Sequence, residues 1–175
     1  MLEGKTVLLG VCACTPAYKS IEIAEGLSGM GADVKVIVTE HASHLVPVQV
    51  LQRASGNPVQ IDQFSAPVIW DRNYRSWTAS GDLLLLAPAS ADMLGKIANG
   101  IADDYLSTNI LSFEGPVFLA MNMNPALYGN RAVQRNVQQL ADDGYYFISN
   151  GDRENPSRMP SVDRILDTVA SFLMR

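Results

Sequence analysis

The chain has 175 residues, which is enough for one domain with a buried core and too few for two domains of ordinary size. Apolar residues make up 47% of the sequence and charged residues 18%, a composition that excludes a disordered or fibrous protein. The net charge of −5 argues against a nucleic-acid partner, because phosphate binding requires clustered lysines and arginines.

The start of the sequence lacks the signs of export or membrane insertion. Its first apolar run is only about six residues long, too short for the hydrophobic region of a secretory signal. No segment approaches the roughly 18 apolar residues of a membrane helix. We therefore expect a cytoplasmic protein that does not contact a membrane.

Short β-rich segments alternate with helical patterns along the chain, which is typical of a parallel sheet covered on both faces. The predicted strands are 5–11, 33–39, 82–87, 116–121 and 145–148. The predicted helices are 17–30, 42–54, 91–98, 103–111, 131–141 and 161–173. Segment 59–78 is less regular and predicts an active-site loop or a short helix. The pattern as a whole predicts a single α/β domain over 1–175.

The two cysteines, Cys12 and Cys14, are separated by one residue. In an extended segment their side chains would point to opposite sides, which disfavours an unstrained disulfide. A zinc site needs about four ligands, and the histidines are limited to His41 and His44. We expect no metal, and we favour structural or cofactor-lining cysteines over a reactive thiol.

Ligands of open parallel sheets bind beyond the carboxyl ends of the strands. The loops expected there are CACTPA, TEHASH, PASAD, AMNMN and SNGD, all rich in small or hydrogen-bonding residues. The first has neither the GxGxxG nor the GxxxxGK[ST] pattern, so it does not indicate NAD or a nucleoside triphosphate. Ala13, Cys14 and Thr15 enter a helix there and would hold a phosphate with backbone N–H groups. A tight turn that requires small residues explains the same pattern.

The run APASADMLGKIANGIADDYLST is more specific. Together with GVCACTPAYKS, SGNPV and LAMNMNPALYGNRAVQRN, it resembles the homo-oligomeric flavin-containing cysteine decarboxylase family, which includes decarboxylases of coenzyme A and lantibiotic biosynthesis. The likeness covers most of the chain. It implies a flavodoxin-like Rossmann three-layer sandwich with a parallel sheet of five or six strands. It also implies FMN bound at a subunit contact and assembly as a homotrimer or homododecamer.

The resemblance also implies roles for individual residues. Those expected at the cofactor are Ala13, Cys14, Thr15, Thr39, Ser90, Ala91, Asp92, Met93, Ser107, Thr108 and Ala120. Asp92 and Met93 stand where the family has Asn and Thr. Asn122 would orient a substrate carboxylate, a task suited to an amide because its N–H groups donate without adding charge. The other interpretation of Asn122 is a turn residue.

Two departures from the family pattern bear on catalysis. Tyr74 stands at the position of the family's catalytic histidine. Since the reference pKa of tyrosine is about 10, Tyr74 is a poor base, and packing beside Trp70 and Trp77 or contact with a ligand is favoured over catalysis. Enzymes of coenzyme A synthesis carry a reducing cysteine where this chain has Asn150. The lantibiotic branch also lacks that cysteine.

The ending YYFISNGDRENPSR and VDRILDTV is also similar to the flavoprotein subunit of dipicolinate synthase. Within it, Arg153 or Arg158 would pair with an anionic substrate, or would be a solvated surface charge. Two hypotheses follow. The first is an FMN-dependent oxidative decarboxylase, or a related flavin oxidoreductase, acting on a small carboxylate or a peptide C-terminus. The alternative is a flavin-binding subunit that does not decarboxylate.

Overall fold

The computed structural model of the chain describes residues 1–62 and 75–175. It contains a five-stranded parallel sheet in the order β2-β1-β3-β4-β5. The strands are β1 (Thr6–Val11), β2 (Asp33–Val38), β3 (Leu83–Ala89), β4 (Val117–Met121) and β5 (Tyr146–Phe147). The predicted strands and the flavodoxin-like α/β fold are therefore confirmed.

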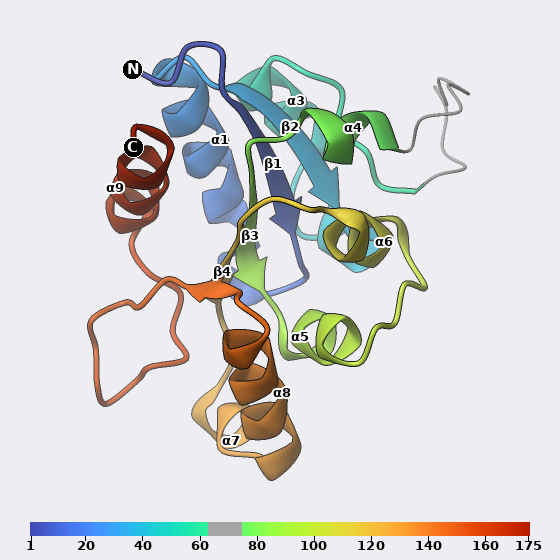
Figure 1. The fold of residues 1–175 in the computed structure, drawn as a ribbon, viewed down its shortest axis with the longest axis vertical. Helices are drawn as coiled ribbons and strands as arrows, with labels where there is room; N and C mark the ends of the chain where they lie inside the picture. Colours follow the sequence, from blue (N-terminus) through green and yellow to red (C-terminus); the bar gives the residue numbers. More distant parts are fainter. Residues whose placement is uncertain (63–74) are drawn as a thin grey trace.

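Helices cover both faces of this sheet (Figure 1). One face packs against α1 (Lys19–Gly29), α3 (Val48–Ser55) and α9 (Val162–Leu173), and the other against α5 (Ala91–Ala98), α6 (Tyr105–Ser112) and α8 (Arg131–Asp142). In the central strand β3, Leu83 and Leu85 face the first set of helices while Leu84 and Leu86 face the second. A strand buried on both faces explains the continuous apolar run in the sequence. No helix within the described residues is long and apolar enough to cross a membrane.

The segment predicted as one helix over 42–54 is divided in two, so that prediction is wrong. Helix α2 (Glu40–Ser43) ends ahead of Pro47, and α3 begins immediately after it. Proline has no backbone N–H and cannot continue the hydrogen-bond ladder of a preceding helix. The chain therefore leaves the helical conformation between Ser43 and Val48 instead of continuing as one helix.

Three short helices complete the described parts of the chain. They are η1 (Thr15–Tyr18), α4 (Arg75–Ser80) and α7 (Pro125–Tyr128). Helix α7 lies in a segment predicted as a loop, and Asn124 starts it by accepting a hydrogen bond from the Leu127 N–H at 2.7 Å. Helix α4 agrees with the short-helix alternative for the end of segment 59–78. Trp70 and Tyr74 lie outside the described residues, so the predictions made for them stay predictions.

The outer edge of β2 is covered by the segment that follows α3. Gln60 donates its backbone N–H to the Val36 carbonyl at 3.0 Å and accepts from the Val38 N–H at 2.8 Å. The Asn57 amide donates to the Val34 carbonyl at 2.9 Å. At the opposite edge, β5 has only 2 residues. Neither edge of the sheet therefore presents a long row of unpaired backbone groups.

The carboxyl ends of the strands are linked to one another directly. The Thr39 N–H, at the end of β2, donates to the Val11 carbonyl at 3.0 Å. The Asn122 N–H, at the end of β4, donates to the Ala89 carbonyl at 2.9 Å. These bonds bring the loops after β1, β2, β3 and β4 to one end of the sheet, where ligands of such folds bind.

Candidate functional site

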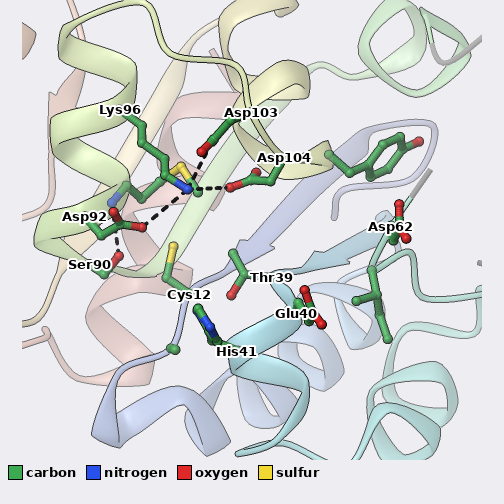
Figure 2. A pocket seen from close by; sticks show the side chains of 14 residues that line it. Cys12, Thr39, Glu40, His41, Asp62, Ser90, Asp92, Lys96, Asp103 and Asp104 are labelled. Carbon is green, nitrogen blue, oxygen red and sulfur yellow. Dashed lines mark hydrogen bonds and ion pairs between the residues drawn. The ribbon is translucent and has the colours of Figure 1, made fainter. Parts of the chain in front are cut away.

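A pocket of about 790 Å³ opens beyond the carboxyl ends of β1, β2 and β3 (Figure 2). Its lining residues are Cys12, Ala13, Thr39, Glu40, His41, Ile61, Asp62, Ser90, Asp92, Met93, Lys96, Asp103, Asp104 and Tyr105. Sites for drug-sized molecules and cofactors have volumes of roughly 300–1,000 Å³. The pocket is therefore large enough for a cofactor, and it lies at the end of the sheet that the sequence predicts.

The β2 side of the pocket carries one neutral side chain, Thr39, and two ionisable ones, Glu40 and His41. Thr39 follows the strand and begins α2 as its N-cap, where its hydroxyl oxygen accepts from the Ala42 N–H at 3.2 Å. Figure 2 shows Thr39, Glu40 and His41 together on this side. Ala13 follows β1 nearby, is exposed, and carries only a methyl group. This small side chain leaves the backbone accessible to a ligand.

Both cysteines follow β1 and both are buried free thiols. Burial raises the pKa of Cys12 to about 12 and that of Cys14 to about 11. Cys12 lines the pocket, whereas the Cys14 thiol donates to the Asn122 carbonyl at 3.5 Å. Because the thiolate is the reactive form of cysteine, these values favour structural or cofactor-lining roles over a reactive thiol.

The amino-terminal end of α5 forms the β3 side of the pocket. Ser90 caps this helix, its hydroxyl oxygen accepting from the Met93 N–H at 3.2 Å. The N–H groups of Ala91 and Asp92 belong to the first helical turn, which has no intrahelical acceptor. The positive end of the helix dipole adds to their attraction for an acceptor group. This end of α5 can therefore bind carbonyl or hydroxyl oxygens of a ligand.

A charged cluster joins α5 to the segment before α6 (Figure 2). The Lys96 ammonium lies 2.9 Å from Asp104, 3.0 Å from Asp103 and 3.5 Å from Asp92. Partial burial lowers the pKa of Lys96, but the hydrogen bonds to Asp104 and Asp103 outweigh it and raise the pKa above its ordinary value. Lys96 is therefore fixed as a cation at the pocket wall.

Asp104 has a second role, as the N-cap of α6. Its carboxylate accepts from the Ser107 N–H at 2.7 Å, and the Asp104 N–H donates to the Ser107 hydroxyl at 3.1 Å, which completes a capping box. Partial burial raises the pKa of Asp104, but hydrogen bonds from Ser107 and Lys96 bring it below its ordinary value. The carboxylate thus holds α5 and α6 together.

Asn122 follows the last residue of β4 and is not among the residues that line the pocket. Its side-chain oxygen accepts from the Met159 N–H at 3.2 Å. Its backbone contacts Ala89 on β3 and the thiol of Cys14. Asn122 is therefore connected to the loops after β1 and β3 and to the loop before α9.

The structure gathers part of the predicted cofactor set at the pocket: Ala13, Thr39, Ser90, Asp92 and Met93. The rest does not line it: Cys14, Thr15, Ala91, Ser107, Thr108 and Ala120. The Ser107 and Thr108 hydroxyls are bonded to Asp104, and Ala120 is fully buried in the sheet. Arg153 and Arg158 are exposed in the loop before α9. Contact of these residues with a ligand stays a prediction, as does any role of Tyr74, which is outside the described residues.

Cys12 lines the pocket, in agreement with the cofactor-lining role favoured from the sequence, and Glu40 and His41 come from the predicted TEHASH loop. Sequence reasoning missed the other pocket residues: Ile61, Asp62, Lys96, Asp103, Asp104 and Tyr105. The four-residue spacing of Asp92 and Lys96 on a predicted helix was a readable signal of an ion pair. The approach of Asp103 and Asp104 to the same lysine depends on how the chain turns between α5 and α6, which no spacing in the sequence reveals.

Comparison with curated proteins identifies relatives over most of the chain. The coenzyme A biosynthesis bifunctional protein CoaBC of Bacillus subtilis (strain 168) is 40% identical over 151 residues, which cover 85% of this chain and 36% of that protein. The CoaBC protein of Escherichia coli (strain K12) is 36% identical over 146 residues, covering 82% and 35%. The chain therefore spans about a third of the length of the curated relatives it matches.

Solved structures of similar fold cover all or nearly all of the chain. SpaF, described as an FMN-dependent cysteine decarboxylase, has 27% sequence identity and a TM-score of 0.83, with 100% of both chains covered. A PPC decarboxylase mutant has 25% identity and a TM-score of 0.82, with 97% of this chain and 98% of that chain covered. A family profile described as Flavoprotein matches residues 1–174. The resemblance seen in the sequence is confirmed, and the chain belongs to the flavoprotein family.

Proposed function

We propose that this chain binds FMN in the pocket beyond β1, β2 and β3 and takes part in the oxidative decarboxylation of a cysteine-type carboxylate. The substrate would be a small molecule or a peptide C-terminus. The observation that carries the proposal is the presence, at one end of the sheet, of a cofactor-sized pocket and an anchored amide, Asn122. The names of the relatives, CoaBC and an FMN-dependent cysteine decarboxylase, support the same activity.

The pocket has groups that suit a flavin. The first-turn N–H groups of α5 would bind oxygens of the ribityl chain or the ring, and Met93 adds an apolar residue to the pocket wall. Exposed Ala13 leaves room for close approach to the backbone after β1. These are neutral contacts, as expected for the uncharged parts of FMN.

The phosphate of FMN needs a different part of the site. The Lys96 cluster has one cation for three carboxylates, so it would repel an anion. Thr39 and His41 lie on the β2 side, apart from that cluster (Figure 2). We assign the phosphate to the backbone after β1 near Ala13, as the sequence predicts, with Thr39 elsewhere along the cofactor.

The proposed chemistry divides between cofactor and protein. Bound FMN would accept a hydride from the cysteine Cβ while the thiol proton passes to solvent, which would leave a thioaldehyde that can take up the electron pair of the breaking C–C bond. Asn122 would hold the substrate carboxylate by its amide N–H groups and leave it ionised, so that neutral carbon dioxide can depart. Because the cysteines of the chain are limited to Cys12 and Cys14, residues 149–151 offer no thiol to reduce the product. We therefore expect the unsaturated thiol itself to be released.

The test begins with the purified protein. We expect a flavin absorption spectrum, FMN as the molecule released on denaturation by mass spectrometry, and release of carbon dioxide from phosphopantothenoylcysteine or from a cysteine-ended peptide. A preparation that stays colourless with excess FMN, and gives no heat of binding in a calorimeter, would rule out the cofactor proposal.

A second candidate is a flavin-binding subunit without decarboxylase activity. Two features of the sequence favour it: Tyr74 at the position of the family's histidine and Asn150 at that of the reducing cysteine. A yellow protein that releases no carbon dioxide from either substrate would support this candidate. If a Tyr74→His variant then released carbon dioxide, the missing base alone would explain why the natural chain lacks decarboxylase activity.

A further inference from the structure

The segment 157–159, just before α9, lies against the end of β4. The Ser157 hydroxyl donates to the Met123 carbonyl at 3.0 Å, and the Met123 N–H donates to the Ser157 carbonyl, also at 3.0 Å. Two residues further on, the Met159 N–H donates to the Asn122 side-chain oxygen at 3.2 Å. Ser157 is 2% exposed and Met159 is 6% exposed, so water does not compete freely for these bonds.

This contact fixes which end of the Asn122 amide is presented to a ligand. A backbone N–H can only donate, so the atom that faces Met159 must be the amide oxygen. The nitrogen, with its two N–H groups, therefore points elsewhere, and within the described residues no acceptor is bonded to it. The amide is thus oriented as a donor, which is the polarity that a carboxylate requires.

The loop that carries Ser157 is itself held in shape. The Asn150 amide donates to the carbonyls of Asn155 and Arg158, both at 2.8 Å. The Arg158 N–H donates to the Asn155 carbonyl at 3.1 Å. These hydrogen bonds within 150–158 hold the loop in one conformation next to the segment that contacts Asn122.

From these contacts we infer that Ser157 is a positioning residue for the Asn122 amide, acting through the backbone of Met123 and Met159. The inference rests on the proposed function, because it assumes that Asn122 binds the substrate carboxylate. Of the three bonds, only the Ser157 hydroxyl bond depends on a side chain of this loop. Ser157 is accordingly the position where a substitution would loosen the contact while leaving Asn122 in place.

The experiment uses the FMN-loaded full chain and two matched probes. N-acetyl-L-cysteine carries the carboxylate, and N-acetylcysteamine is the same molecule without it. Binding of each probe is followed by the change in flavin absorption. We expect Ser157→Ala to weaken binding of N-acetyl-L-cysteine by about tenfold, the effect of one lost hydrogen bond that leaves a buried carbonyl unpaired, and to leave N-acetylcysteamine binding unchanged. Ser171→Ala, at an exposed serine of α9, is the control and should change neither.

A second variant guards against general loss of structure. Ser157→Cys keeps nearly the same volume with a weaker donor and should give a smaller loss in the same direction. Hydrogen exchange of the Met159 amide should be faster in both variants, with FMN affinity unchanged. Equal weakening of both probes, or no weakening of either with Asn122→Ala still impaired, would overturn the positioning role. If Asn122→Ala itself bound N-acetyl-L-cysteine normally, the proposed function of Asn122 would be at fault, and the inference would fall with it.

Discussion

The two sides of the candidate site are held by different forces. On the α5–α6 side, Lys96 joins three carboxylates. On the β4 side, neutral hydrogen bonds connect Asn122 and Met123 to Ser157 and Met159. Ion pairs act over several ångströms and weaken with salt, whereas neutral hydrogen bonds depend on short distance and alignment. The charged side is thus suited to holding two helices together, and the neutral side to fixing the angle of one amide.

The largest effect is expected on the neutral side, when Asn122 is given a charge. Asn122→Asp keeps the shape of the side chain but replaces the donor with a carboxylate that repels the substrate. We expect kcat/KM for decarboxylation of the substrate to fall by about 100-fold or more in Asn122→Asp, and by only about tenfold in Asn122→Ala, which loses the donor without adding a repelling charge. An equal effect of both substitutions would argue that Asn122 only supports the turn.

The second prediction concerns the α5–α6 side, where removal of the Lys96 cation should lower the stability of the fold. Lys96→Met keeps the aliphatic length but leaves Asp92, Asp103 and Asp104 without their cationic partner. Because these carboxylates are partly or mostly exposed, we expect a loss of about 1 kcal/mol in the free energy of unfolding, measured in urea. Lys19→Met, on α1, is the matched control and should change the free energy by less than about 0.5 kcal/mol. A similar loss in both variants would show that the Lys96 cluster contributes no specific stability.

The dependence of stability on pH should differ between variants of the charged α5–α6 side and variants of the neutral β4 side. The pKa of Asp104 is lowered in the folded chain, so the unfolded chain binds more protons and stability rises with pH over this range. The contribution is complete above the unfolded pKa of about 4 and is lost as pH falls through the lower folded value. In Asp104→Asn, which keeps a capping side chain without the charge, the loss of stability between about pH 5 and pH 2 should be shallower. Ser157→Ala should keep the slope of the natural chain.

The smallest effect concerns the thiols. With the pKa of Cys14 raised by burial to about 11, only about one molecule in a thousand carries the thiolate at pH 8. We expect a thiol reagent to label the native chain slowly, at a rate that rises with pH, and both cysteines to react quickly in urea. Fast labelling of Cys14 itself in the native chain at pH 8, located by mass spectrometry, would contradict its assignment as a donor to Asn122.

Features set by neighbouring residues in the sequence could be predicted, whereas contacts between residues far apart in the sequence could not. Continuous apolar runs such as Leu83–Leu86 predict buried strands, because that pattern is local. The division of the helix at Pro47 was also local, and the apolar spacing around it concealed the break. The contacts of Lys96 with Asp103 and Asp104, and of Met159 with Asn122, join residues that meet only after folding. Spacing alone could not predict them.

The protected edges of the sheet bear on how copies of this chain can associate. Gln60 and Asn57 bond the Val34 and Val36 carbonyls and the Val38 N–H on the outer side of β2, and β5 has only 2 residues. Strand addition across subunits is therefore disfavoured at both ends. Contacts between copies would then form more readily through helices and loops than through the sheet edges, which lowers the risk of fibril-like stacking.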